Sequence, residues 1–174
     1  VIGFIILKYD VLSLLGMTLL VFANDFATMS LATDNAKPAT NLSKWRFKAL
    51  ALSSTILGLL LLVESLIAIY IGTTVYHFNM QQMQTFILLV MVFTSQFRVL
   101  IVRERKWFWS SKPGRELVAS IIGVIVAFTI LGCVGIIITP IGLDKTVTAL
   151  IYSAAFTIGI DPAKVLVFKK FGIT

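Results

Sequence analysis

The chain has 174 residues, of which 58% are hydrophobic and only 13% are charged, and its mean hydropathy is +0.96. A soluble domain has roughly half of its residues apolar and about a quarter charged, so this composition excludes an ordinary soluble domain and indicates a membrane protein. The net charge of +7 would also suit a nucleic-acid-binding protein. The placement of the charges favours a membrane topology instead, and we expect neither a nucleic-acid partner nor a soluble domain.

Five hydrophobic segments are long enough to cross a bilayer, because its hydrocarbon core of roughly 30 Å takes about 20 helical residues. Residues 1–7 precede them and are too short to span, so we interpret them as the end of another helix and the chain as part of a longer protein. The sequence therefore predicts an all-α, polytopic transmembrane helix bundle over residues 1–174, with five full spans and the end of a sixth. The spans are expected at about 11–33, 48–72, 80–102, 117–139 and 146–171.

Most of the 15 lysine and arginine residues lie in the two long connections, near 34–47 and 103–116, or at the C-terminus. Lys8 and Lys145 lie in short connections that belong to the other side of the membrane. Because positive loops stay in the cytoplasm, this distribution predicts a multi-pass protein whose long connections and C-terminus are cytoplasmic.

Asp25 lies in the first expected span, in the middle of an apolar run, and Asn24 beside it supplies a hydrogen-bond donor and acceptor as a second expected ion-binding residue. A carboxylate at the centre of a membrane helix costs roughly 2.5–3.5 kcal/mol on insertion scales, so it indicates an ion or proton site. Removal from water disfavours the charged form, and such a group can bind a proton when enclosed and release it when open to water. A helix–helix hydrogen bond without a transport role is the alternative.

Two further charged residues fall within expected spans, Glu64 in the second and Arg98 near the cytoplasmic end of the third. Glu64 could be a second polar ligand or the partner of a cation that seals the bundle. Arg98 could extend to the membrane interface or pair with an intramembrane acid. His77 is the single histidine, and no cluster of histidine, cysteine and carboxylate residues suggests a metal site.

The stretch NDFATMSLATDNAKP at 24–38, followed by Trp45, resembles the sixth membrane helix of P-type cation ATPases and the loop after it. The plasma-membrane proton ATPases are most similar, since they carry an Asn-Asp pair, a Met-Ser/Thr run, an Asp and a Lys-Pro in this order. SQFRVLIVRERKWFWSSKPG at 95–114 resembles the end of the eighth helix, and DPAKVLVFKKF at 161–171 resembles, more loosely, the tenth. The chain thus resembles the C-terminal membrane region, from the end of the fifth helix through the tenth.

This resemblance implies ATP-driven export of a cation, with H⁺ as the expected cargo, across the plasma membrane. The proton-carrying carboxyl group of the family maps onto Asp25, and Asp34 and Lys37 would lie in the loop that couples the membrane helices to the phosphorylation domain. The resemblance also implies partners before Val1, namely the first membrane helices and the cytoplasmic domains, which would bind ATP and Mg²⁺. We expect no cofactor in the present segment, and we expect that this segment alone cannot hydrolyse ATP.

Three alternatives stay open at this point. Glu64 does not match the residue expected there in plant and fungal proton pumps, so a P-type pump for another cation, such as Ca²⁺, Mg²⁺ or Na⁺, is the nearest alternative. The other two are a membrane scaffold without chemistry and a passive channel that is lined by Asp25 and Glu64.

Overall fold

The computed structural model describes residues 2–31, 47–102 and 113–171, and these residues form helices joined by short connections, without a strand among them. Four of the helices are long and apolar enough to cross a membrane, at Leu14–Leu31, Ser54–Val75, Met80–Ile101 and Arg115–Val134. The predicted all-α transmembrane bundle is therefore confirmed. The helices are α1 (Ile2–Leu7), α2 (Leu14–Leu31), α3 (Phe47–Tyr70), the π-helical η1 (Ile71–Val75), α4 (Met80–Val102), α5 (Arg115–Val134) and α6 (Leu143–Phe171).

Helix α6 covers the region of the fifth expected span but is not one of these four helices. It is 29 residues long and includes Asp144, Lys145 and Asp161. At 1.5 Å per residue its length exceeds the thickness of a bilayer core, so part of it extends beyond the hydrocarbon if the helix spans. The fifth span stays a prediction.

Helix α5 ends earlier than the hydrophobic run that contains it, at Val134 rather than near residue 139. Gly135 follows in the left-handed conformation, with a φ of 74°, and its N–H donates to the carbonyl oxygen of Leu131 at 3.0 Å. Only glycine adopts this conformation without strain, so Gly135 terminates the helix even though isoleucines follow it.

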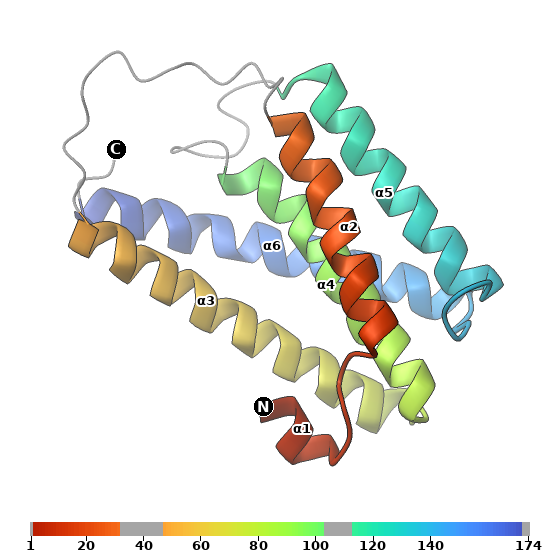
Figure 1. Ribbon diagram of the computed structural model, residues 1–174. Helices are drawn as coiled ribbons and strands as arrows, with labels where there is room; N and C mark the ends of the chain where they lie inside the picture. The colour runs from red at the N-terminus through yellow and green to blue at the C-terminus, as the bar shows by residue number, and fades with distance from the viewer. Residues whose placement is uncertain (1, 32–46, 103–112, 172–174) are drawn as a thin grey trace.

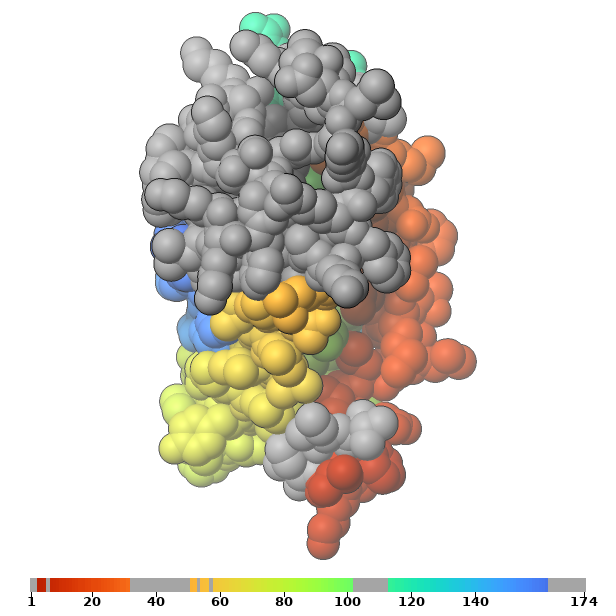
Figure 2. All heavy atoms as spheres, turned by 90° about the vertical axis from the view of Figure 1, so that its left-hand side faces the viewer, coloured from red at the N-terminus to blue at the C-terminus, as the bar shows by residue number. Residues whose placement is uncertain are grey.

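Helix α4 occupies the centre of the bundle, with α2 in front of it and α6 crossing behind it in the view of Figure 1. It also packs against α3 and α5. Its large side chains, such as Phe86, Leu89 and Phe93, are fully buried. The outer helices instead expose large apolar side chains, and Figure 2 shows parts of α3 and α2 at one outer face. An apolar exterior around a packed centre is the arrangement expected in lipid.

Polar side chains on the inner helices bond to carbonyl oxygens of neighbouring helices. Gln96 Nε2 on α4 donates to the carbonyl oxygen of Ala23 on α2 at 3.2 Å, and Ser153 Oγ on α6 donates to that of Val90 on α4 at 3.2 Å. Such bonds hold membrane helices together where hydrophobic burial against lipid contributes little. They fix α2 and α6 on α4 and so position the polar groups described next.

Candidate functional site

Asp25 lies on the outer face of α2. The buried face of this helix is a stripe of small residues, Gly16, Ala23 and Ala27, of which the two alanines are at most 1% exposed. Asp25 is two residues from each alanine, about half a helical turn, and its side chain is therefore exposed on the opposite side. Within the described residues, no interhelical hydrogen bond or ion pair of Asp25 is found.

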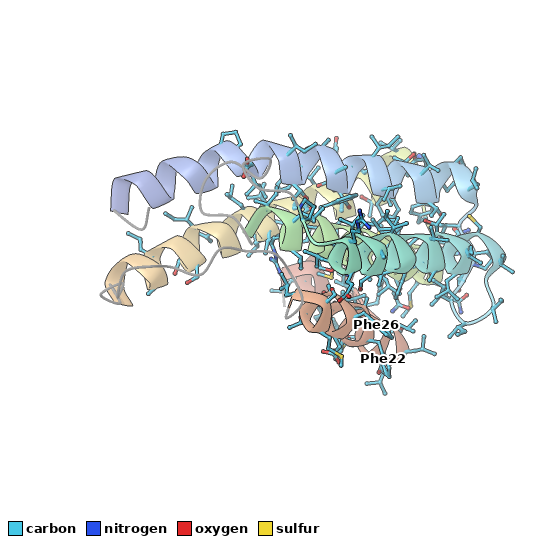
Figure 3. All side chains as sticks on the ribbon, turned by 90° about the horizontal axis from the view of Figure 1, so that it is seen from above. Phe22 and Phe26 are labelled. Carbon is cyan, nitrogen blue, oxygen red and sulfur yellow. The ribbon has the colours of Figure 1, made fainter. Side chains whose placement is uncertain are left out.

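Large apolar side chains surround Asp25 on this outer face. Phe22 and Phe26 are 60% and 58% exposed and project from α2 to the outside of the bundle, as Figure 3 shows. They also form the rim of an apolar groove of about 480 Å³ between α2 and α5, with Gly123 and Val124 on the other side. The outer face of α2 is thus an apolar surface with one carboxylate at its centre.

Asn24 points away from Asp25, into a cavity between α2, α3 and α4. This cavity, here called the polar cavity, has a volume of about 190 Å³. The structure brings Asn24 together with Glu64 and Arg98 around it, although these three residues come from three different helices. The side chain of Asn24 lines this cavity, whereas that of Asp25 is exposed on the outer face of α2. The expectation that the two bind one ion together stays a prediction. The polar residues of the lining are Asn24, Glu64, Ser65, Thr94, Ser95 and Arg98.

Glu64 on α3 is 3% exposed and is the buried carboxyl group of the polar cavity. Thr94 Oγ1 on α4 donates a hydrogen bond to Glu64 Oε1. The backbone carbonyl of Glu64 accepts a second bond, from Tyr152 Oη on α6 at 2.7 Å. Side chains of α4 and α6 therefore hold both the carboxyl group and the backbone of Glu64 in place.

Arg98 lies one helical turn after Thr94, so that the two side chains share a face of α4. Arg98 lines the polar cavity and is half-buried. Within the described part of the chain, Arg98 and Glu64 form no ion pair within 4 Å, although both line the cavity. Arg98 thus faces the cavity as well as the end of its helix.

Sequence reasoning identified Glu64 and Arg98 but missed Thr94, Ser95 and Tyr152. A signal for the two hydroxyl residues of α4 was present, because Thr94 and Arg98 are four residues apart and must share a helix face. Tyr152 carries no comparable signal, since its contact with α3 depends on how α6 crosses the bundle.

Two other predicted residues, Asp34 and Lys37, lie outside the described residues, and their role in coupling stays a prediction. Among the residues that are described, no three histidine, cysteine, aspartate or glutamate side chains come together in a way that could hold a metal ion.

Comparison with known proteins gives one informative match. The chain is 26% identical over 160 residues to a protein of Methanocaldococcus jannaschii named "Putative cation-transporting ATPase". The match covers 91% of this chain but 20% of that protein, so the chain spans about a fifth of its relative's length. No family model matches the chain. The chain is therefore a multi-pass membrane protein that is similar, over nearly all of its length, to part of a cation-transporting ATPase.

Proposed function

We propose that this chain is the ion-transporting membrane portion of an ATP-driven P-type cation pump, that its cargo is H⁺, and that Asp25 binds the proton. The similarity to a cation-transporting ATPase supports the class of pump. The resemblance of residues 24–38 to the sixth helix of proton pumps supports the choice of cation.

The position of Asp25 is the observation that carries the proposal. It is exposed at the centre of α2, on a face where large apolar side chains such as Phe22 and Met29 are also exposed. A carboxylate that faced lipid at this depth would cost roughly 2.5–3.5 kcal/mol, and polar residues inside membranes accordingly face other protein or a water-filled path. We therefore propose that other helices of the complete pump cover this face and enclose Asp25.

The transport step follows from the chemistry of an enclosed carboxyl group. In a state open to the cytoplasm, Asp25 takes up a proton. Phosphorylation elsewhere in the pump then shifts the helices, Asp25 is exposed to water on the other side, and the ionised form becomes favourable, so the proton leaves. Helices α3 to α6 provide the support against which α2 moves.

The complete pump would bind ATP and Mg²⁺ in cytoplasmic domains outside this chain, and it would lie in the plasma membrane. The long connections, including Asp34 and Lys37, and the C-terminus would face the cytoplasm, as the charge distribution suggests. A pump for another cation is the second candidate function, because Glu64 adds a carboxyl group to the membrane region.

The test is ATP-driven proton uptake by the full-length protein in sealed vesicles, followed with a pH-sensitive dye. Asp25→Asn keeps the size of the side chain but removes the ionisable group, so we expect uptake to be abolished. Asp10→Asn is the matched control, because Asp10 lies in the exposed connection before α2 and should leave uptake unchanged. Full uptake by a folded Asp25→Asn protein would refute the assignment, whereas ATP hydrolysis that depends on another cation would favour the second candidate.

A further inference from the structure

The polar cavity is separate from Asp25, since it lies between α2, α3 and α4 whereas Asp25 lies on the outer face of α2. Its volume of about 190 Å³ is large enough for several water molecules. Its six polar side chains offer the hydrogen-bond partners that buried water needs. These polar groups lie among apolar side chains such as Leu61 and Met91, so they are the places in the cavity where water can bind.

Glu64 is the group in this cavity whose burial needs a reason. Its side chain is 3% exposed, it lies in a membrane-spanning helix, and an ionised carboxylate is strongly disfavoured there unless it is paired. The bond from Thr94 satisfies one carboxyl oxygen but supplies no charge. The protonated carboxyl group therefore fits the arrangement in the structure, and the ionised form needs a counter-charge.

Arg98 can supply that counter-charge. It lines the same cavity from α4 and forms no ion pair with Glu64 among the described residues, so that its long side chain can reach either the cavity or the membrane interface. A metal cation is a poor ligand for this cavity, because one carboxylate and one guanidinium already balance and a further positive charge would have no partner. When a proton neutralises Glu64, the remaining positive charge is that of Arg98, whose long side chain can extend to the membrane interface.

We infer that the polar cavity is a proton-binding site, in which Glu64 carries the proton, cavity water exchanges it, and Arg98 balances the carboxylate once the proton has left. In the exchange, the O–H bond of the Glu64 carboxyl group breaks and the proton passes to a water molecule, which becomes hydronium; uptake is the reverse. The site does not depend on which cation the pump carries or on the role of Asp25.

Within residues 2–31, 47–102 and 113–171, the charged and titratable groups that face Glu64 come from two of its neighbouring helices. Arg98 faces it from α4, and Tyr152 lies against its backbone from α6. Asn24 faces the cavity from α2 and has no charge, while the neighbouring Asp25 points to the other side of that helix. Arg98 is therefore the group whose charge should control the protonation of Glu64 most strongly.

Infrared difference spectroscopy tests the site directly, on the full-length protein in lipid, by comparing spectra recorded at acid and alkaline pH. A buried protonated carboxyl group gives a C=O stretching band that disappears on ionisation. We expect such a band in the unmodified protein, loss of the component from Glu64 in Glu64→Gln, and retention of that component in Asp25→Asn. Arg98→Gln should keep the band and shift its titration to higher pH, by about one unit or more if Arg98 approaches the carboxylate.

Thr94→Val is the conservative variant that keeps Glu64 and removes only its hydrogen bond. It should retain the band but move it to higher frequency, because a C=O group that accepts no hydrogen bond vibrates faster, and this shift would assign the band to the carboxyl group that Thr94 holds. The inference is overturned if the unmodified protein lacks a titrating carboxyl band, or if every component of the band survives Glu64→Gln. These outcomes are independent of ATP-driven uptake, so failure of the proposed function and failure of this site can be distinguished.

Discussion

The two acids of the membrane-spanning helices lie in opposite surroundings. Glu64 is enclosed between helices, with a hydroxyl donor on its side chain and a second donor on its backbone. Asp25 is exposed on the outer face of α2, among phenylalanines that project away from the bundle. Both residues are acids within hydrophobic segments, so the hydropathy of the sequence does not distinguish them. In the structure Glu64 is buried inside the bundle, whereas Asp25 lies on a surface that we propose other helices cover.

The same contrast separates the interior around α4 from the outer helices in general. Around α4 the side chains interlock, and loss of a few atoms leaves a cavity. On the outer face of α3 or α5, lipid replaces any atoms that are lost. The same substitution should therefore lower the free energy of unfolding more around α4 than on the outer face of α3 or α5.

The largest difference is expected for leucine truncation. Leu89 on α4 is fully buried, so Leu89→Ala should lower the free energy of unfolding by about 2–5 kcal/mol. Leu59 on α3 is 59% exposed, and Leu59→Ala should change it by no more than about 0.5 kcal/mol. Reversible unfolding in mixed micelles, followed by circular dichroism, measures both. Equal costs would mean that α4 is not the packed centre of the bundle.

A smaller difference is expected between two glycines of α5. A Cβ atom at Gly132 would lie 2.8 Å from Leu89 Cδ1 and 3.0 Å from Thr146 Oγ1, whereas a Cβ atom at Gly123 would meet nothing within 4 Å. Both substitutions raise helix propensity by a similar amount, but only Gly132→Ala overpacks the interior. Gly132→Ala should therefore be less stable than Gly123→Ala by about 1–2 kcal/mol. The same unfolding assay ranks the two variants, and the opposite ranking would contradict the packing of α5 against α4 and α6.

The sequence was sufficient to predict the membrane helices and the presence of Asp25 and Glu64 within them, because length and apolarity determine a span. It did not show which face of each helix points inward, because lipid is as apolar as a protein core and the usual polar side of a helix is missing. The small residues Ala23 and Ala27, four apart in α2, were the available signal, since small residues let membrane helices approach closely. Their spacing predicts that Asp25, two residues from each, lies on the outer face.

The end of α5 had a signal as well, in Gly135 and Pro140, but the isoleucines between them extended the apparent span. Apolarity alone does not report helix termination, which here depends on the left-handed conformation of one glycine. The polar cavity could be predicted only in part, because its residues come from α2, α3 and α4 and their convergence is a property of the packing.

The smallest effect in this series is expected at Tyr152, which links the interior site to α6. Tyr152→Phe removes the hydroxyl that donates to the backbone carbonyl of Glu64, and should lower the free energy of unfolding by about 0.6 kcal/mol, and by no more than about 1.7 kcal/mol. Tyr70→Phe is the matched control, because Tyr70 on α3 is 65% exposed and should show no change.

This last pair also sharpens the contrast between the two acids. The Tyr152 hydroxyl bonds to the backbone of Glu64 and not to its carboxyl group, so Tyr152→Phe should loosen α3 against α6 while the titrating carboxyl band keeps its frequency. If instead the band moved as far as in Thr94→Val, the Glu64 side chain would depend on α6 as well as on α4, and the polar cavity would extend to the helix behind it. If the band keeps its frequency while the free energy of unfolding falls, the Tyr152 hydroxyl stabilises the backbone of Glu64 without affecting the protonation of its side chain.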